Sequence, residues 1–224
     1  MSVNDPEKLL AEAISRFGAE AKKKLSNPGA TGAPEDQLRA PLERLFQDLE
    51  EALGMAAHDA VLVGETSLAD LKTRPDYSVT RKNALIGFIE VKAPGKGVIP
   101  RQFTDAHDKD QWEKLKALPN LIYTDGNGFS LWRNGQREGE PVFFKGDVRN
   151  SGAELSSPPE LLALLTSFFQ WEPIVPKSPP QLAEVSARLC RFLRDEVTEQ
   201  MALGAKGLTS LAVCGRLPVG KGFL

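Results

Sequence analysis

Residues that could activate water beside a metal ion lie close together between positions 76 and 92. Asp76 follows a proline, and Glu90 and Lys92 stand at the end of the apolar run 85–91. Because side chains alternate along a strand, Glu90 and Lys92 point to the same face, about 6.5–7 Å apart. Two carboxylates on one surface repel each other unless a hard cation such as Mg²⁺ lies between them. Such a metal lowers the pKa of a bound water, and a nearby lysine stabilises charge on a phosphate, so the pattern predicts phosphodiester hydrolysis.

A β-hairpin would bring Asp76 to the same surface. If residues 76–81 pair with residues 85–90, with Asn83 at the centre of the turn, Asp76 lies opposite Glu90. The same register places four apolar side chains together on the core side of the hairpin: Tyr77, Val79, Ile89 and Val91. Glu-x-Lys alone is also compatible with a strand that ends in a surface ion pair. The preceding Pro-Asp makes the pattern more specific.

The elements that must position these residues alternate between helical and strand periodicity. Helices are expected over 6–25, 34–53 and 105–118, from 158 onward, and over 181–203; strands are expected at 60–63, 76–80, 85–92, 121–124, 129–132 and 142–144. This order predicts an α/β or α+β fold in which helices flank a small mixed sheet. We expect an N-terminal helix and linker over 1–30, a central domain over 31–150 and a helical extension over 151–224. The glycine-rich ending suggests that this extension is cut short relative to a longer architecture.

Composition and charge narrow the class of protein. The chain has 224 residues, is 41% hydrophobic and 26% charged, and has no run approaching the ~18–20 apolar residues of a membrane span. Two cysteines cannot form a disulfide framework and the N-terminus lacks the order of a secretory signal, so we expect a cytoplasmic protein without membrane partners.

A net charge of −2 argues against binding nucleic acid over the whole surface. Residues 71–101, however, carry seven Lys or Arg and two acids. That segment is either a phosphate-facing patch or a solvated hairpin edge whose lysines discourage aggregation.

The motif Pro75-Asp76, followed by Glu90-Val91-Lys92, resembles that of the PD-(D/E)xK nuclease superfamily. The stretch from about Leu42 to Gly135 looks like the nuclease domains of restriction-modification enzymes, including the type ISP kind and the restriction subunits of type I systems. The resemblance implies a restriction-endonuclease-like core, Mg²⁺ as cofactor and DNA as substrate. It implies that Asp76 and Glu90 are metal ligands, that Lys92 is the catalytic lysine and that Gln111 is the glutamine on the helix after the core motif.

Further assignments rest on the same resemblance. An additional acid before the sheet would be Glu43, which is also compatible with a plain surface residue of an amphipathic helix, or Glu65. The candidate contacts to the DNA backbone are Lys72, Arg74, Lys96 and Arg101. The resemblance also implies a methylase or translocase component, in cis or in trans. The alternative function is a non-cleaving DNA-binding or structural module of a methylase or restriction complex, docking through 181–203.

Overall fold

A six-stranded mixed sheet forms the centre of the computed structural model, which describes residues 5–64, 74–82 and 84–172 together with six separate positions between 183 and 198. The strands follow one another across the sheet in chain order. They are β1 (Ala60–Gly64), β2 (Tyr77–Arg81), β3 (Ala84–Val91), β4 (Leu121–Thr124), β5 (Gly128–Arg133) and β6 (Gln136–Phe143). Among the described strands, only β3 and β4 pair in parallel, because a helix separates them in the chain and carries it back to the same end of the sheet. The remaining neighbours are antiparallel and are joined by shorter connections.

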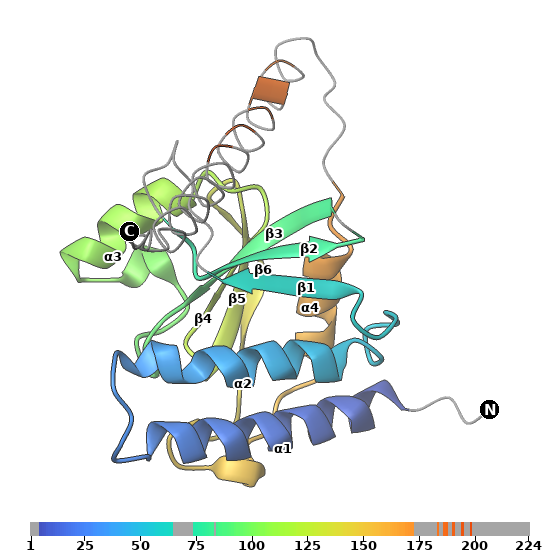
Figure 1. The fold of residues 1–224 in the computed structure, drawn as a ribbon, viewed down its shortest axis with the longest axis vertical. Helices are drawn as coiled ribbons and strands as arrows, with labels where there is room; N and C mark the ends of the chain where they lie inside the picture. The colour runs from blue at the N-terminus through green and yellow to red at the C-terminus, as the bar shows by residue number, and fades with distance from the viewer. Residues whose placement is uncertain are drawn as a thin grey trace, which may run out of the picture. The chain divides into compact units, whose positions relative to one another are not determined.

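Within the part of the chain that the structure describes, four α-helices flank the sheet (Figure 1). They are α1 (Pro6–Leu25), α2 (Pro34–Leu49), α3 (Ala106–Leu115) and α4 (Glu160–Phe169), with two short 3₁₀ turns, η2 (Pro100–Gln102) and η3 (Gly152–Glu154). α1 begins where the side chain of Asp5 accepts a hydrogen bond from the backbone of Glu7, and α3 begins where Asp105 accepts bonds from two backbone N–H groups. The predicted α+β fold with a small mixed sheet is therefore confirmed.

The two faces of the sheet are covered by different helices. α1, α2 and α4 supply apolar side chains to one core, where Leu42, Phe46 and Phe168 are fully buried with Ile89 of β3. α1 and α2 run side by side in this layer (Figure 1). On the other face, Trp112 of α3 packs edge-on against aromatic rings of β4 and β5, Tyr123 and Trp132. Burying each such large side chain contributes about 1.5–3 kcal/mol to folding.

The register of β2 and β3 agrees with the sequence expectation where the candidate residues lie. Tyr77 pairs with Ile89, and one further step places Asp76 opposite Glu90. The four side chains predicted to share the core side are all buried in the α1–α2–α4 core. A bulge between Val79 and Thr80 shifts the pairing toward the turn. Asn83, predicted at the centre of that turn, lies outside the described residues.

Two predicted boundaries differ from the structure. α2 ends at Leu49 rather than Leu53, because the buried carboxylate of Glu50 turns back to accept hydrogen bonds from the backbone of His58 (2.6 Å) and Ala60 (3.0 Å). β6 begins at Gln136 rather than Val142. Pro141 is tolerated there because β6 is an edge strand, whose unpaired side needs no donor.

The chain divides into a compact unit of residues 1–67 and 71–173 and a second unit of residues 68–70 and 174–224. In the first unit, α1 and α4 contribute to the same core as α2, so the segments before residue 30 and just after 150 pack with the central region. The domain boundaries themselves stay predictions. In the second unit the six described positions are helical, and most of the helix expected over 181–203 lies outside the described residues. Among the helices that the structure describes, none has the length and apolar character needed to cross a membrane.

Candidate functional site

The predicted catalytic residues meet in a pocket of about 260 Å³ at one end of the sheet. Asp76 directly precedes β2, Glu90 is the penultimate residue of β3, and Lys92 directly follows β3. α3 contributes Gln111, and the first turns of α2 close the opposite side. The lining consists of Glu35, Asp36, Arg39, Asp76, Glu90, Val91, Lys92, Ala93, Lys96, His107, Asp108 and Gln111. The structure therefore brings together the four residues that the sequence singled out.

Both carboxylate oxygens of Asp76 accept a hydrogen bond. Oδ2 accepts from the backbone N–H of Val91 at 2.8 Å, which fixes the start of β2 against the end of β3. Oδ1 accepts from Nη2 of Arg39, on α2, also at 2.8 Å. Burial raises the pKa of Asp76, and the Val91 N–H and the Arg39 guanidinium oppose that rise without cancelling it.

Glu90 is the most enclosed acid of the pocket, with 2% of its surface exposed. Its Oε1 lies 3.0 Å from Nζ of Lys92. No group in the described part of the chain donates a hydrogen bond to its buried Oε2. Burial and the neighbouring Asp76 raise the pKa of Glu90 to about 7, and Lys92 and Gln111 only partly offset this. Because no described group donates to Oε2, a further positively charged partner would stabilise the ionised form of this carboxylate.

Lys92 is held by three acceptors at once. Besides Glu90, its ammonium contacts Oδ1 of Asp108 at 2.9 Å and donates a hydrogen bond to Oε1 of Gln111. Burial lowers the pKa of Lys92, but the carboxylates of Glu90 and Asp108 outweigh burial and leave the pKa raised. Lys92 therefore remains a fixed positive charge at neutral pH.

Asp108 is a site residue that the sequence reasoning missed. It lies one turn before Gln111 on α3, so both side chains face β3. Its two oxygens contact Lys92 and Lys96, the latter at 2.7 Å, and these two cations outweigh burial and lower its pKa. The spacing of three residues before Gln111 was the available signal. Arg39 was missed as well, and no local pattern marks it.

Other predicted residues lie elsewhere. Glu43 accepts a hydrogen bond from the Tyr77 hydroxyl at 2.9 Å and is absent from the pocket lining. Glu35, the second residue of the same helix, is the α2 glutamate that lines the pocket. Arg101 donates to the carbonyl of Gly135 at 2.6 Å and lies over the Trp132 ring, away from this pocket. Arg74 is exposed just before the Pro-Asp motif. Glu65 and Lys72 lie outside the described residues.

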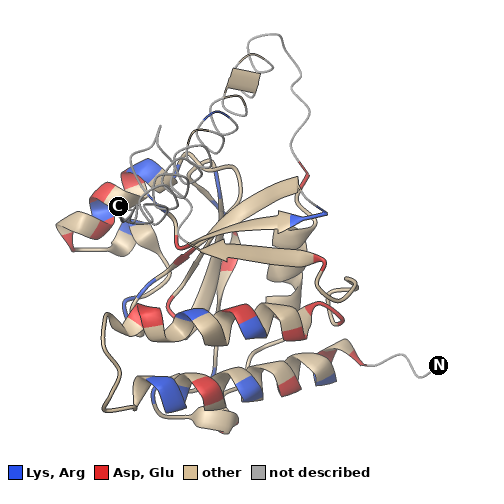
Figure 2. Cartoon of the chain, viewed as in Figure 1, with Lys and Arg blue, Asp and Glu red and all other residues tan. Residues whose placement is uncertain are grey.

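The basic segment predicted over 71–101 does not form one continuous patch in the part of it that the structure describes. Arg81 pairs with Asp59 at 2.7 Å, Lys92 is buried, and Lys96 contacts Asp108. Over the helices, positive and negative side chains alternate along α1 and α2 rather than separating (Figure 2). Positive charge near the candidate site therefore comes from a few individual side chains.

The pocket's own charge balance favours a cation. Five carboxylates and three cationic side chains line it, a formal excess of two negative charges. A divalent cation would neutralise that excess, and Asp76 and Glu90 are hard oxygen ligands of the kind Mg²⁺ accepts. The unpaired Oε2 of Glu90 fits such a partner. Asp76 and Glu90 would supply two ligands. The described residues hold no cluster of three or more His, Cys, Asp or Glu side chains suited to a metal. The remaining positions of a Mg²⁺ ion would fall to water and substrate oxygens.

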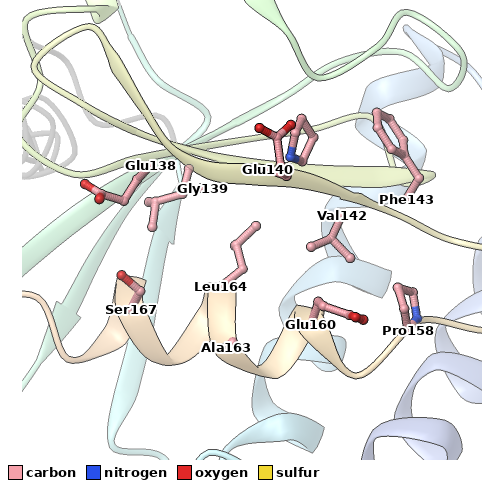
Figure 3. Close-up of a pocket in the computed structure, with 12 residues that line it drawn as sticks. Glu138, Gly139, Glu140, Val142, Phe143, Pro158, Glu160, Ala163, Leu164 and Ser167 are labelled. Carbon is pink, nitrogen blue, oxygen red and sulfur yellow. The ribbon is translucent and has the colours of Figure 1, made fainter.

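A larger hollow of about 600 Å³ lies between β6 and α4 (Figure 3). Val142 of β6 and Leu164 of α4 point toward each other across the gap (Figure 3). Glu138 and Glu140 at its rim are already paired with Arg133 and Arg137. None of the predicted site residues lines this hollow, so its larger volume does not make it the candidate catalytic site.

Comparison with known proteins gives little further guidance. No family model matches this chain, and no curated protein matches it. Among solved structures, the chain is similar to one titled "cryoEM structure DrdV-DNA complex", with a TM-score of 0.47 and 21% identity. The match covers 73% of this chain and 14% of that chain, so this chain spans a small part of the other protein's length. Chains with so little sequence in common often differ in activity, so function is argued from the site itself.

Proposed function

We propose that this protein is a Mg²⁺-dependent DNA endonuclease domain of restriction-modification type, which hydrolyses phosphodiester bonds. The observation that carries the proposal is the meeting of Asp76, Glu90 and Lys92 in one pocket with an excess of negative charge. DNA phosphates would be repelled by such a pocket unless a cation were present. The charges of the lining therefore support a requirement for a divalent metal.

Each side chain has a separate role in this proposal. Asp76 and Glu90 would hold the metal, which when bound supplies an activated water and polarises the phosphodiester. Lys92, fixed by Asp108 and Gln111, would stabilise negative charge that develops on the phosphate oxygens. Lys96 and Arg74, near the pocket and the motif, would contact the DNA backbone without reading its sequence. Sequence selection and coupling would come from a methylase or translocase component, in cis or in trans.

The test is nicking of a supercoiled plasmid with Mg²⁺ by the wild type and by Asp76→Ala, Glu90→Ala and Lys92→Ala. Each substitution should lower the cleavage rate by roughly a hundredfold or more, because it removes a metal ligand or a charge acting in the transition state. Glu154→Ala, at an exposed position of η3, is the matched control and should cleave like the wild type. Equal cleavage by all five proteins would refute the proposal.

A second candidate function is a DNA-binding or structural module that does not cleave. The observation that favours it is the full engagement of Asp76, whose two oxygens are already bonded to Arg39 and Val91. Calorimetric titration with Mg²⁺ separates the two functions. A cleaving enzyme should bind the ion in a way that Glu90→Ala abolishes, whereas a non-cleaving module should bind DNA without any such dependence.

A further inference from the structure

Arg39 stands where a metal ion would need to contact Asp76. It extends from α2 into the pocket, and its Nη2 lies 2.8 Å from Oδ1 of Asp76. Oδ2 of the same carboxylate is committed to the backbone N–H of Val91. Oδ1 is therefore the oxygen that both a guanidinium and a metal ion would use.

We propose that Arg39 competes with the divalent cation for Asp76 and, once displaced, contacts a phosphate of the DNA. This inference rests on the proposed nuclease function and adds a role for a residue that no sequence motif marks. Two cations on one carboxylate oxygen repel each other strongly in a partly buried site. Binding of the ion at Asp76 therefore releases the guanidinium from it.

The structure provides a place for the released side chain. Asp36 lies one helical turn before Arg39, and Nε of Arg39 is already 3.4 Å from its Oδ1. The Arg39 side chain is partly exposed, with 28% of its surface accessible, so it can swing without unpacking the core. A planar guanidinium at the mouth of a metal site suits two-pronged binding of a phosphate. The same arginine thus shields Asp76 before DNA arrives and binds the backbone afterwards.

The experiment measures metal and DNA binding separately, because the inference predicts changes of opposite sign. Mg²⁺ affinity is measured by calorimetry without DNA, in the full chain, for the wild type and for Arg39→Ala and Arg39→Gln. Affinity for a short duplex is measured by fluorescence anisotropy with Ca²⁺ in place of Mg²⁺, to avoid cleavage. Arg44→Ala is the matched control, since Arg44 is an exposed arginine of the same helix outside the pocket lining.

Both Arg39 variants should bind Mg²⁺ about tenfold more tightly and DNA about tenfold more weakly than the wild type, and Arg44→Ala should change neither affinity by more than about twofold. The neutral glutamine keeps the length and polarity of the side chain, so the result does not depend on the alanine variant folding well. A merely structural arginine would weaken both affinities or neither. Unchanged or weaker Mg²⁺ binding in a folded Arg39 variant overturns the inference, as does unchanged DNA binding.

Failure of the proposed function gives a different result. If neither the wild type nor the Arg39 variants take up Mg²⁺, the metal site itself is refuted, and this inference with it. If the wild type binds Mg²⁺ and the variants bind it no better, only the competition is refuted. Uptake by the variants but not by the wild type would support strong competition.

Discussion

Glu90 is the residue whose environment departs furthest from that of an ordinary carboxylate. It is nearly inaccessible, it faces Asp76, and one of its oxygens has no donor in the described structure. Lys92 supplies one positive charge, but that ammonium is shared with Asp108. A buried acid that is incompletely compensated takes up a proton more readily, so the pKa of Glu90 rises to about 7. Such a group stabilises the protein only when it is protonated or when another cation joins it.

The stability of the metal-free protein should therefore fall as the pH rises through the Glu90 transition. The pKa of Glu90 is about 7 when folded and near its ordinary 4.5 when unfolded, so the folded state holds the proton more tightly. The resulting stabilisation is complete below about pH 4.5 and is lost by pH 7–8, at about 1.4 kcal/mol per unit of pKa difference. Glu90→Gln should remove this decline. Urea unfolding at pH 5, 6, 7 and 8 measures it, with exposed Glu154→Gln as the control; a decline that persists in Glu90→Gln would assign it to other groups.

Lys96 and Arg101 were both predicted to contact DNA, and the structure separates them. Lys96 lines the pocket, whereas Arg101 is bonded to Gly135 and packed on Trp132. Lys96→Ala should make the slope of log DNA affinity against log salt concentration shallower by about one unit, as expected for one lost phosphate contact. Arg101→Ala should change the slope little. Anisotropy titrations between about 50 and 200 mM salt distinguish the two variants, and an equal loss of slope in both would place the DNA over Arg101 as well.

At the scale of elements, the site depends on the β2–β3 hairpin and on the two helices that close its end. The hairpin sets Asp76 opposite Glu90, and a slip of β2 by one residue against β3 would turn Asp76 toward the apolar core. α3 brings Asp108 and Gln111 to Lys92, and α2 brings Arg39 to Asp76. β3 is therefore the element whose position affects the site most. α4 packs against the opposite face of β3 and holds the strand in place.

Gly87 makes that close packing of β3 possible. A Cβ at this position would lie 2.6 Å from the Phe168 ring of α4 and 2.8 Å from Asn120. The Asn120 amide bonds the carbonyls of Ile86 and Phe168, so it cannot move aside freely. Gly87→Ala should lower the free energy of unfolding by about 1–3 kcal/mol.

Gly64→Ala is the matched control for this substitution. Gly64 also lies in a strand without a left-handed backbone, and among the described residues a Cβ there meets nothing closer than the Asp76 carbonyl at 4.0 Å. It should change the free energy of unfolding by less than about 0.5 kcal/mol. Urea unfolding of both variants measures the difference, and equal stability of the two would show that α4 shifts to accommodate the added methyl group at little cost.

At the scale of the whole molecule, charge is nearly balanced and is interspersed along the helices (Figure 2). A protein with a net charge of −2 gains no general attraction for DNA. Under the proposed function, DNA binding would then come from the pocket and its surroundings once a cation is bound. The folded state, which assembles the two carboxylates from separate segments, should bind that cation far better than the unfolded chain.

Mg²⁺ should therefore raise the melting temperature of the whole protein. A ligand at a hundred times its dissociation constant stabilises the folded state by about 2.7 kcal/mol. Thermal melts with and without Mg²⁺, at ionic strength matched with KCl, measure the shift. Asp76→Asn and Glu90→Gln should melt at the same temperature in both buffers. A shift that survives in both variants would locate the ion elsewhere.

The β2–β3 hairpin, and the carboxylates that it brings together, follow from the alternation of residues along the chain. Alternation of Tyr77 and Val79 against Ile89 and Val91 leaves one register that buries all four, and that register places Asp76 and Glu90 on the opposite face. The period of the apolar residues likewise located α1, β4 and most other elements to within a few residues. These features are local, because each depends on neighbours within one strand or helix or across one tight turn.

The partners that surround those carboxylates come from the packing of distant segments and could not be predicted from local patterns. Arg39 reaches Asp76 across 37 positions of chain and Asp108 reaches Lys92 across 16, so neither contact leaves a trace in local periodicity. α2 also ends early because of a contact outside the helix: the Glu50 carboxylate accepts a hydrogen bond from the backbone N–H of Ala60. Pairings of this kind arise when separate helices pack on a sheet, and their energies depend on burial that a linear pattern does not contain.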